Sequence, residues 1–230
     1  MNIEEYPCGA VLEAIADSYK MELGFKLEED YINSGFLLIN LKKWRQDNVE
    51  EKFIQFMVEN QNKFYQHDQG VLNEVFKNQF FILDPKYNFM PRFKVLGYDL
   101  NRKYVGIKGE YYSKDIIDNA IQNPIIVHFR GIYWSELWAN ENHPYRNVYE
   151  KYSELAGFKE EVIETDDVSS LPTKLVYGSN NNPFFKFILK IIPASIIYKK
   201  IHRDTIKGFE IIGETHKRLS DMESSSKNED

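Results

Sequence analysis

The chain has 230 residues, of which 43% are hydrophobic and 15% aromatic, and this is enough for one substantial core and at most a small second domain. Charged residues make up 28% and the net charge is −6, so no broad basic face exists and we expect no nucleic-acid partner. The single cysteine, Cys8, cannot form a disulfide within the chain, and the N-terminus lacks a secretory signal pattern, so we expect a cytoplasmic protein.

The first strong strand signal follows a polar Asn-Ser-Gly turn at residues 33–35. Its continuous apolar run, 36–41, is typical of a strand buried on both faces of a mixed sheet. Apolar residues then recur at helical spacing between residues 48 and 64, with acidic residues in the first turn, where the helix dipole favours them. The pattern next predicts a short helix at 68–78, a strand at 80–84 and a proline-bounded connection at 85–93.

A capped helix is predicted at 113–123, because Ser113 can cap its start and Pro124 ends it. The apolar run 125–129 predicts another buried strand. A further helix opens at Pro144, and its predicted packed stripe consists of Tyr145, Val148, Tyr149, Tyr152 and Leu155.

The alternation of strands and helices indicates the α/β class. We expect a folded body at 1–157, an acidic and polar connector at 158–181, an amphipathic basic helical appendage at 182–218 and a disordered tail at 219–230.

Three segments carry a family resemblance. They are "YINSGFLLINLKKW", "HDQGVLNEVFKNQFFILDPKYN", and "IIVHFRG" followed by "HPYRNVYEKY". Together, and in this order, they resemble the motifs of glycosyltransferase family 8, which includes bacterial lipopolysaccharide galactosyl- and glucosyltransferases. The resemblance runs from about residue 10 to residue 157.

The resemblance implies a GT-A-like mixed sheet flanked by helices. It also implies transfer of a hexose from a UDP-sugar, with retained configuration, to a saccharide or lipid-linked acceptor, with Mn²⁺ as the cofactor. Family members precede these motifs with a nucleotide-binding half that ends in an Asp-x-Asp motif, and no Asp-x-Asp occurs in this sequence. We therefore expect an incomplete, C-terminal half of the domain, weak or inactive alone, that associates with itself or with a partner carrying the missing half.

The resemblance assigns a donor-binding role to the 33–35 turn. Asn33 and Ser34 would face the donor hexose, Gly35 would let the backbone approach it, and Asp68 and Gly131 would complete the contacts. From the residues alone, an ordinary turn that leads into a strand is the favoured interpretation of residues 33–35.

The resemblance places Gln69 beside the anomeric carbon, next to Asp68, as the catalytic pair, and makes His128 a metal ligand. The alternatives are a helix N-cap for Asp68 and a buried structural histidine for His128. Two positions depart from the family pattern: Gly70 stands where an aspartate is usual, and Trp134 where a phosphate-binding lysine is expected.

Residues 182–203 combine aromatic and branched apolar side chains with five lysines and arginines. This composition suits an interfacial helix on an anionic membrane surface, which would make the protein peripheral at the inner membrane face. A helical hairpin packed on the body is the alternative. For function, the alternative to a transferase is a non-catalytic remnant or saccharide-binding module.

Overall fold

The computed structural model describes residues 2–61, 66–129, 143–158, 175 and 182–194. The chain divides into two compact units, Met1–Ile192 and Pro193–Asp230. Every helix and strand whose bounds are given below lies in the first unit. The predicted domain boundaries at 157 and 181 stay predictions.

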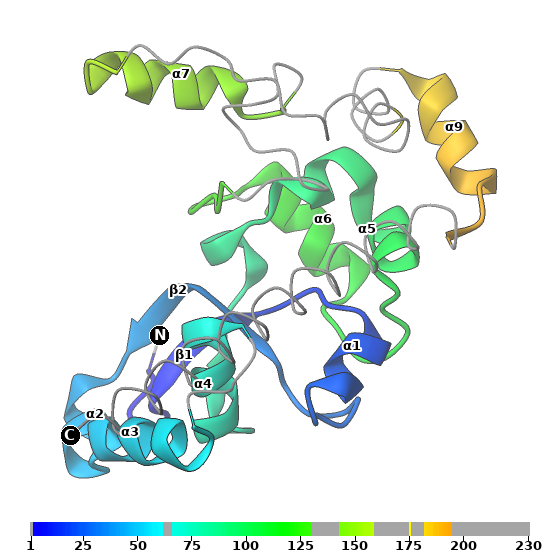
Figure 1. The fold of residues 1–230 in the computed structure, drawn as a ribbon. Coiled ribbons are helices and arrows are strands. Elements are labelled where there is room, and N and C mark those ends of the chain that lie inside the picture. The colour runs from blue at the N-terminus through cyan, green and yellow to red at the C-terminus, as the bar shows by residue number, and fades with distance from the viewer. Residues whose placement is uncertain (1, 62–65, 130–142, 159–174, 176–181, 195–230) are drawn as a thin grey trace, which may run out of the picture. The chain divides into compact units, whose positions relative to one another are not determined.

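The first unit contains a three-stranded mixed sheet with the order β2-β1-β3, whose strands β1 and β2 lie beside α4 (His67–Val75) in Figure 1. β1 (Cys8–Leu12) pairs antiparallel with β2 (Ile32–Ile39) and parallel with β3 (Phe80–Ile82). The predicted α/β class with helices around a mixed sheet is confirmed. β1 was not predicted, although it is the central strand.

The predicted turn at residues 33–35 is wrong, because these residues lie inside β2. Val11 pairs with Asn33, whereas the neighbouring Ala10 pairs with Leu37, so residues 34–36 have no partner opposite them on β1. Such extra residues form a β-bulge, which bends a strand and redirects its side chains. The polar residues that suggested a turn are those of the bulge.

Helices surround the sheet in the first unit. Side chains cap the N-termini of several of them: Asn40 caps α2, Ser113 caps α6, as predicted for Ser113, and Asn182 caps α9. The described elements are α1 (Asp17–Glu22), α2 (Leu41–Gln46), α3 (Val49–Glu59), α4 (His67–Val75), the 3₁₀ turn η1 (Pro85–Asn88), α5 (Pro91–Val105), α6 (Lys114–Gln122), α7 (Arg146–Leu155) and α9 (Pro183–Ile191).

The central strand is buried on both faces. Cys8 and Ala10 point into an apolar cluster with residues of α3 and α4, whereas Val11 joins a second cluster with residues of η1, α5 and α6. The Cys8 side chain has no exposed surface, and burial raises the pKa of its thiol to about 12. The first three of its five residues, Cys8, Gly9 and Ala10, are small, and this explains its weak sequence signal.

Two predictions about the second half need correction. The predicted buried strand 125–129 is reduced to a single bridge between Phe89 and Val127, and Ile125 is 59% exposed. In α7, the predicted stripe is only half right, because Tyr145 is buried but Tyr152 and Leu155 are exposed.

The predicted connection 85–93 contains η1 and the start of α5. Pro91 stands at the first position of α5, where its missing N–H costs nothing. α5 is kinked at Gly97, whose φ of 70° is a left-handed value that glycine adopts without strain.

α9 packs against α5 through its carbonyl groups. Lys103 Nζ donates to the carbonyls of Leu189, Lys190 and Ile192 at 3.3, 3.0 and 2.7 Å, and the Tyr104 hydroxyl donates to the Leu189 carbonyl. Among the described helices, none has both the length and the apolar character to cross a bilayer.

Candidate functional site

Buried polar side chains gather where β1 ends and β2 bulges. Their fractional exposures are between 0 and 8%, although polar groups are rarely so deeply buried without a structural or functional reason. They come from the end of β1, from β2, from α4 and from η1, and they are Glu13, Asn33, Gln69, Asn73 and Asn88. We call this set the polar cluster.

Asn33 is the centre of the polar cluster. Its amide Nδ2 donates to Glu13 Oε2, and its Oδ1 accepts from Asn88 Nδ2 at 2.7 Å and from the Gly35 backbone N–H at 2.8 Å. The last of these bonds stabilises the bulge directly. Asn33 is only 1% exposed. Its orientation is therefore fixed by these hydrogen bonds within the protein.

The carboxylate of Glu13 is held from a second side by Arg92 in α5. Arg92 Nη2 lies 3.0 Å from Glu13 Oε1 and also donates to the Ala14 carbonyl at 2.8 Å. A buried carboxylate needs such a cationic partner, because burying an unpaired charge is expensive. Neither residue was predicted as a site residue, although Glu13 is the one charge in the apolar run 8–16.

Gln69 and Asn73 connect α4 to β2. Gln69 Oε1 accepts from the Ser34 backbone N–H at 3.1 Å. Asn73 exchanges two hydrogen bonds with the backbone of Ile32, at 2.7 and 3.0 Å, and donates to the Gln69 carbonyl at 2.7 Å. The structure therefore brings Gln69 together with the predicted donor-binding segment at residues 33–35.

His128 lies directly against the bulge. A Cβ built on Gly35 would overlap the imidazole atoms Cε1 and Nδ1 of His128 and would lie 2.8 Å from Asn33 Oδ1. His128 is positioned by its backbone N–H, which donates to the Phe89 carbonyl at 3.0 Å. Gly35 is thus required at this position by the close approach of the imidazole.

One predicted site residue is not part of this arrangement, and another is not among the residues that the structure describes. Asp68 lies in the first turn of α4 and is exposed, so it does not join the polar cluster. Gly131 lies outside the described residues. Gly70, at the position where the family pattern has an aspartate, is buried in α4.

No group of three or more histidine, cysteine or carboxylate side chains within the described ranges could hold a metal ion. His128 supplies one imidazole, and a stable Mn²⁺ site needs several oxygen ligands beside it. The donor set of the described residues therefore does not fit a complete metal site.

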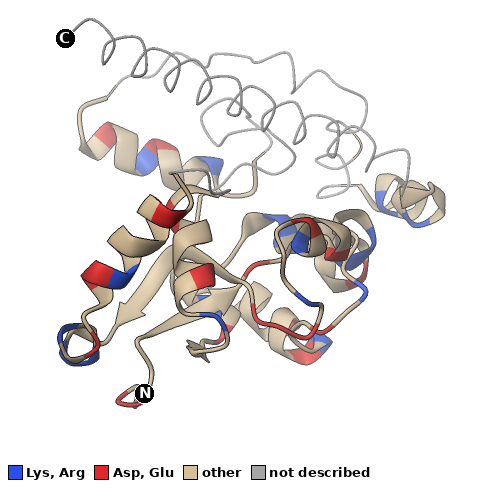
Figure 2. Cartoon of the chain, turned by 60° about the horizontal axis from the view of Figure 1, so that its bottom comes forward, with Lys and Arg blue, Asp and Glu red and all other residues tan. Residues whose placement is uncertain are grey.

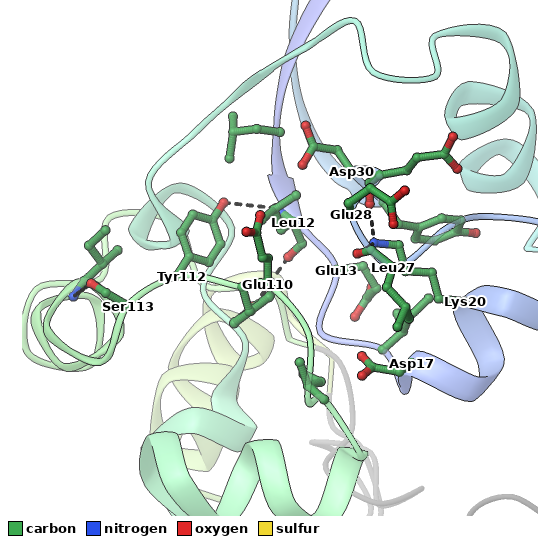
Figure 3. Close-up of a pocket in the computed structure, with 17 residues that line it drawn as sticks. Leu12, Glu13, Asp17, Lys20, Leu27, Glu28, Asp30, Glu110, Tyr112 and Ser113 are labelled. Atoms are coloured by element: carbon green, nitrogen blue, oxygen red, sulfur yellow. Dashed lines mark hydrogen bonds between the residues drawn. The ribbon is translucent and has the colours of Figure 1, made fainter.

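A cavity of about 310 Å³ adjoins the polar cluster, and Glu13 belongs to both (Figure 3). Besides Glu13, its labelled carboxylates come from three segments: Asp17 from α1, Glu28 and Asp30 from the segment before β2, and Glu110 from the segment before α6. Burial raises the pKa of Asp30. The nearby charge of Lys20 lowers this pKa, and that of Glu110 raises it further. Lys20 Nζ itself donates to the Leu27 carbonyl at 2.9 Å.

The sequence profile of glycosyl transferase family 8 matches residues 1–136. The chain therefore belongs to this family, and its predicted family membership is confirmed. The bulge with Asn33 and Gly35, α4 with Gln69, and His128 all fall inside the matched residues.

Two curated relatives illustrate the similarity. General stress protein A of Bacillus subtilis is 31% identical over 159 residues, which cover 66% of this chain and 51% of that protein. A lipopolysaccharide 1,2-glucosyltransferase of Escherichia coli is 30% identical over 125 residues, 52% of this chain and 33% of that enzyme. The chain thus spans about half the length of the first relative and a third of the second.

Among solved structures, the chain is similar to the galactosyltransferase LgtC in complex with donor and acceptor sugar analogues. The TM-score is 0.47 with 24% sequence identity, covering 71% of this chain and 56% of LgtC.

Proposed function

We propose that the protein takes part in the transfer of a hexose from a UDP-sugar, with retained anomeric configuration, to a saccharide or lipid-linked acceptor. Membership of glycosyl transferase family 8 supports glycosyl transfer in general. The identity of the donor, the retained configuration and the acceptor are proposed beyond what family membership supports. We also propose a cytoplasmic location.

The observation that carries the proposal is the assembly around the bulge of β2. Asn33, Gly35, Gln69 and His128 come from three separate segments of the sequence, and they meet through the contacts described above. The buried amide of Asn33 fixes the bulge through its bond to the Gly35 N–H. The exposed backbone at Gly35 and the adjacent imidazole of His128 are groups that can recognise sugar hydroxyls at close range. Asp68, exposed at the start of α4, is available to a ligand from solvent.

For catalysis, we propose that Gln69 lies beside the anomeric carbon and that its orientation depends on the Ser34 N–H bond. His128 would contribute one ligand to Mn²⁺, with the remaining ligands supplied from outside the described residues. We propose that a partner chain or a second copy of this chain supplies these ligands, so the protein would act in association with it. When bound, the metal would stabilise the diphosphate leaving group.

The test is calorimetric titration of the folded chain with UDP, with and without Mn²⁺. We expect binding that requires Mn²⁺ and is lost in His128→Ala, whereas His67→Ala, which removes an exposed histidine, should bind as the parent does. No UDP binding by the folded chain in either condition would refute the proposal for this chain.

A non-catalytic, saccharide-binding protein is the second candidate. It is favoured by the lack of a complete metal site among the described residues and by the buried glycine at position 70. Glycan-array binding without hydrolysis of UDP-glucose or UDP-galactose would support this candidate. Mn²⁺-dependent hydrolysis would exclude it.

A further inference from the structure

We infer that α9 is a membrane-contacting helix that rests flat on an anionic bilayer, with Phe184, Phe187 and Ile191 as the side chains that enter it. This inference is independent of the proposed glycosyl transfer, because it concerns another surface and another ligand.

The first observation is an exposed apolar stripe on α9. Phe184 is 63% exposed, Phe187 59% and Ile191 65%, although all are large apolar side chains. At about 100° per residue, these positions fall within an arc of about 60° on one side of the helix. Exposed apolar side chains gathered on one face mark an interaction surface more often than scattered ones do.

The second observation is that the opposite side of α9 is already occupied. Leu189 has no exposed surface, and its position lies about 140° around the helix from Phe184. Lys103 and Tyr104 of α5 bond the carbonyls at the end of the helix, which fixes α9 on the body. The apolar surface of α9 is therefore wider than the part that packs against α5. The stripe of Phe184, Phe187 and Ile191 is the part that stays exposed.

The third observation is the charge beside the stripe. Lys186 and Lys190 are exposed and lie on the polar side of the helix, next to Phe187. α9 carries lysines but no carboxylate (Figure 2). Residues 182–203 contain five lysines and arginines and no acidic residue, so their net charge is +5. The whole chain has a net charge of −6, so the remaining residues together carry −11.

This combination fits an anionic lipid surface. An interfacial helix buries its apolar face at the level of the lipid headgroups, and its lysines pair with the negative charge there. A second copy of the chain fits less well, because a stable protein interface buries roughly 800 Å² per partner, and a stripe of three side chains supplies far less.

The test is sedimentation of the full chain with vesicles of neutral phosphatidylcholine, and with vesicles that also contain phosphatidylglycerol. We expect the protein to pellet with the anionic vesicles. The double variant Phe187→Ser, Ile191→Ser should lower the partition coefficient at least about tenfold, because burial of the exposed parts of these two side chains together contributes at least that much.

Lys186→Gln with Lys190→Gln tests the charge without altering the apolar stripe or the buried side of α9. We expect roughly a fivefold loss of binding for each lysine. Val58→Ser is the matched control, because Val58 is 69% exposed but lies on α3, which begins with two glutamates. This variant should bind vesicles as the parent does.

Absence of pelleting with anionic vesicles would overturn the inference, and so would equal binding to neutral vesicles or equal losses in the Val58 control. A dimer in light scattering that disappears in Phe187→Ser, Ile191→Ser, without vesicle binding by the parent, would assign the stripe to a second copy instead. A failure of UDP titration leaves these outcomes unaffected, so the two proposals can fail separately.

Discussion

At the scale of single residues, the site depends on side chains whose freedom is removed by neighbours. Asn33 is fixed by Glu13, Asn88 and the Gly35 N–H. Sequence reasoning predicted roles for Asn33, Gly35, Gln69 and His128 because the motifs that contain them are short and contiguous, and the structure brings these residues together. It missed the partners that hold them, because Glu13, Asn88 and Arg92 reach the cluster through the fold.

Gly35→Ala should disturb the site, because its Cβ would overlap the His128 imidazole. We expect a loss of about 1–3 kcal/mol in the free energy of unfolding, the usual cost of overpacking, together with weakened UDP binding. Urea unfolding measures the first and calorimetry the second. Gly109→Ala is the control, because its Cβ would meet the Asp17 carboxylate at 3.6 Å, an ordinary contact. Equal effects at both glycines would contradict the prediction.

Asn88→Ala removes the donor to Asn33 Oδ1 in a buried setting. Losing one partner of a buried hydrogen bond costs about 1–3 kcal/mol, so we expect a lower urea midpoint with an unchanged m-value. Asn123→Ala is the control, because it deletes an exposed hydrogen bond from Asn123 Nδ2 to Asn119 Oδ1 at 3.0 Å. This variant should cost less than about 0.5 kcal/mol. A neutral Asn88→Ala would show that Asn33 is held by its other partners alone.

At the scale of elements, the sequence predicted those with strong local signals. α6 has a serine cap and a proline just after its end, and both worked as predicted. α5 was missed because Pro91 was interpreted as part of a connection, whereas a proline can also begin a helix. β1 was missed because three of its five residues are Cys, Gly and Ala, which give little strand signal, and because its burial between two layers is a tertiary property.

Lys103→Met should loosen α9, because Lys103 donates to three carbonyls at the C-terminal end of that helix. A helix whose last carbonyls lose their cationic partner is less stable. We expect hydrogen exchange of the α9 amides to accelerate severalfold, while amides of β1 stay protected. Lys108→Met is the control on an exposed lysine. Unchanged exchange in α9 would mean that packing of Leu189 suffices to hold the helix.

At the scale of the whole molecule, the pH dependence of stability should contain a term from His143. Burial lowers the pKa of His143 from 6.5 to about 4. The unfolded chain therefore binds a proton between pH 6.5 and 4 that the folded chain does not, so this contribution is complete above pH 6.5 and is lost as the pH falls towards 4. The loss is at most about 3 kcal/mol.

Urea unfolding of the parent and of His143→Gln at several pH values measures this term. The stability of the parent should fall more steeply with acidity than that of the variant. The comparison removes the contributions of Asp30 and Glu74, whose raised pKa values act in the opposite direction in both proteins. His67→Gln, at an exposed position, should follow the parent curve. Parallel curves for all three would refute the assignment to His143.

The single thiol of the chain can report how often the sheet opens. Cys8 stands in the central strand with no exposed surface and, because burial raises the pKa of its thiol to about 12, almost no thiolate at neutral pH. A disulfide reagent such as DTNB can therefore react only when β1 leaves its neighbours, and the labelling rate counts those openings. We expect no labelling over hours in buffer and complete labelling in urea. Fast labelling in buffer would show that the sheet opens without global unfolding.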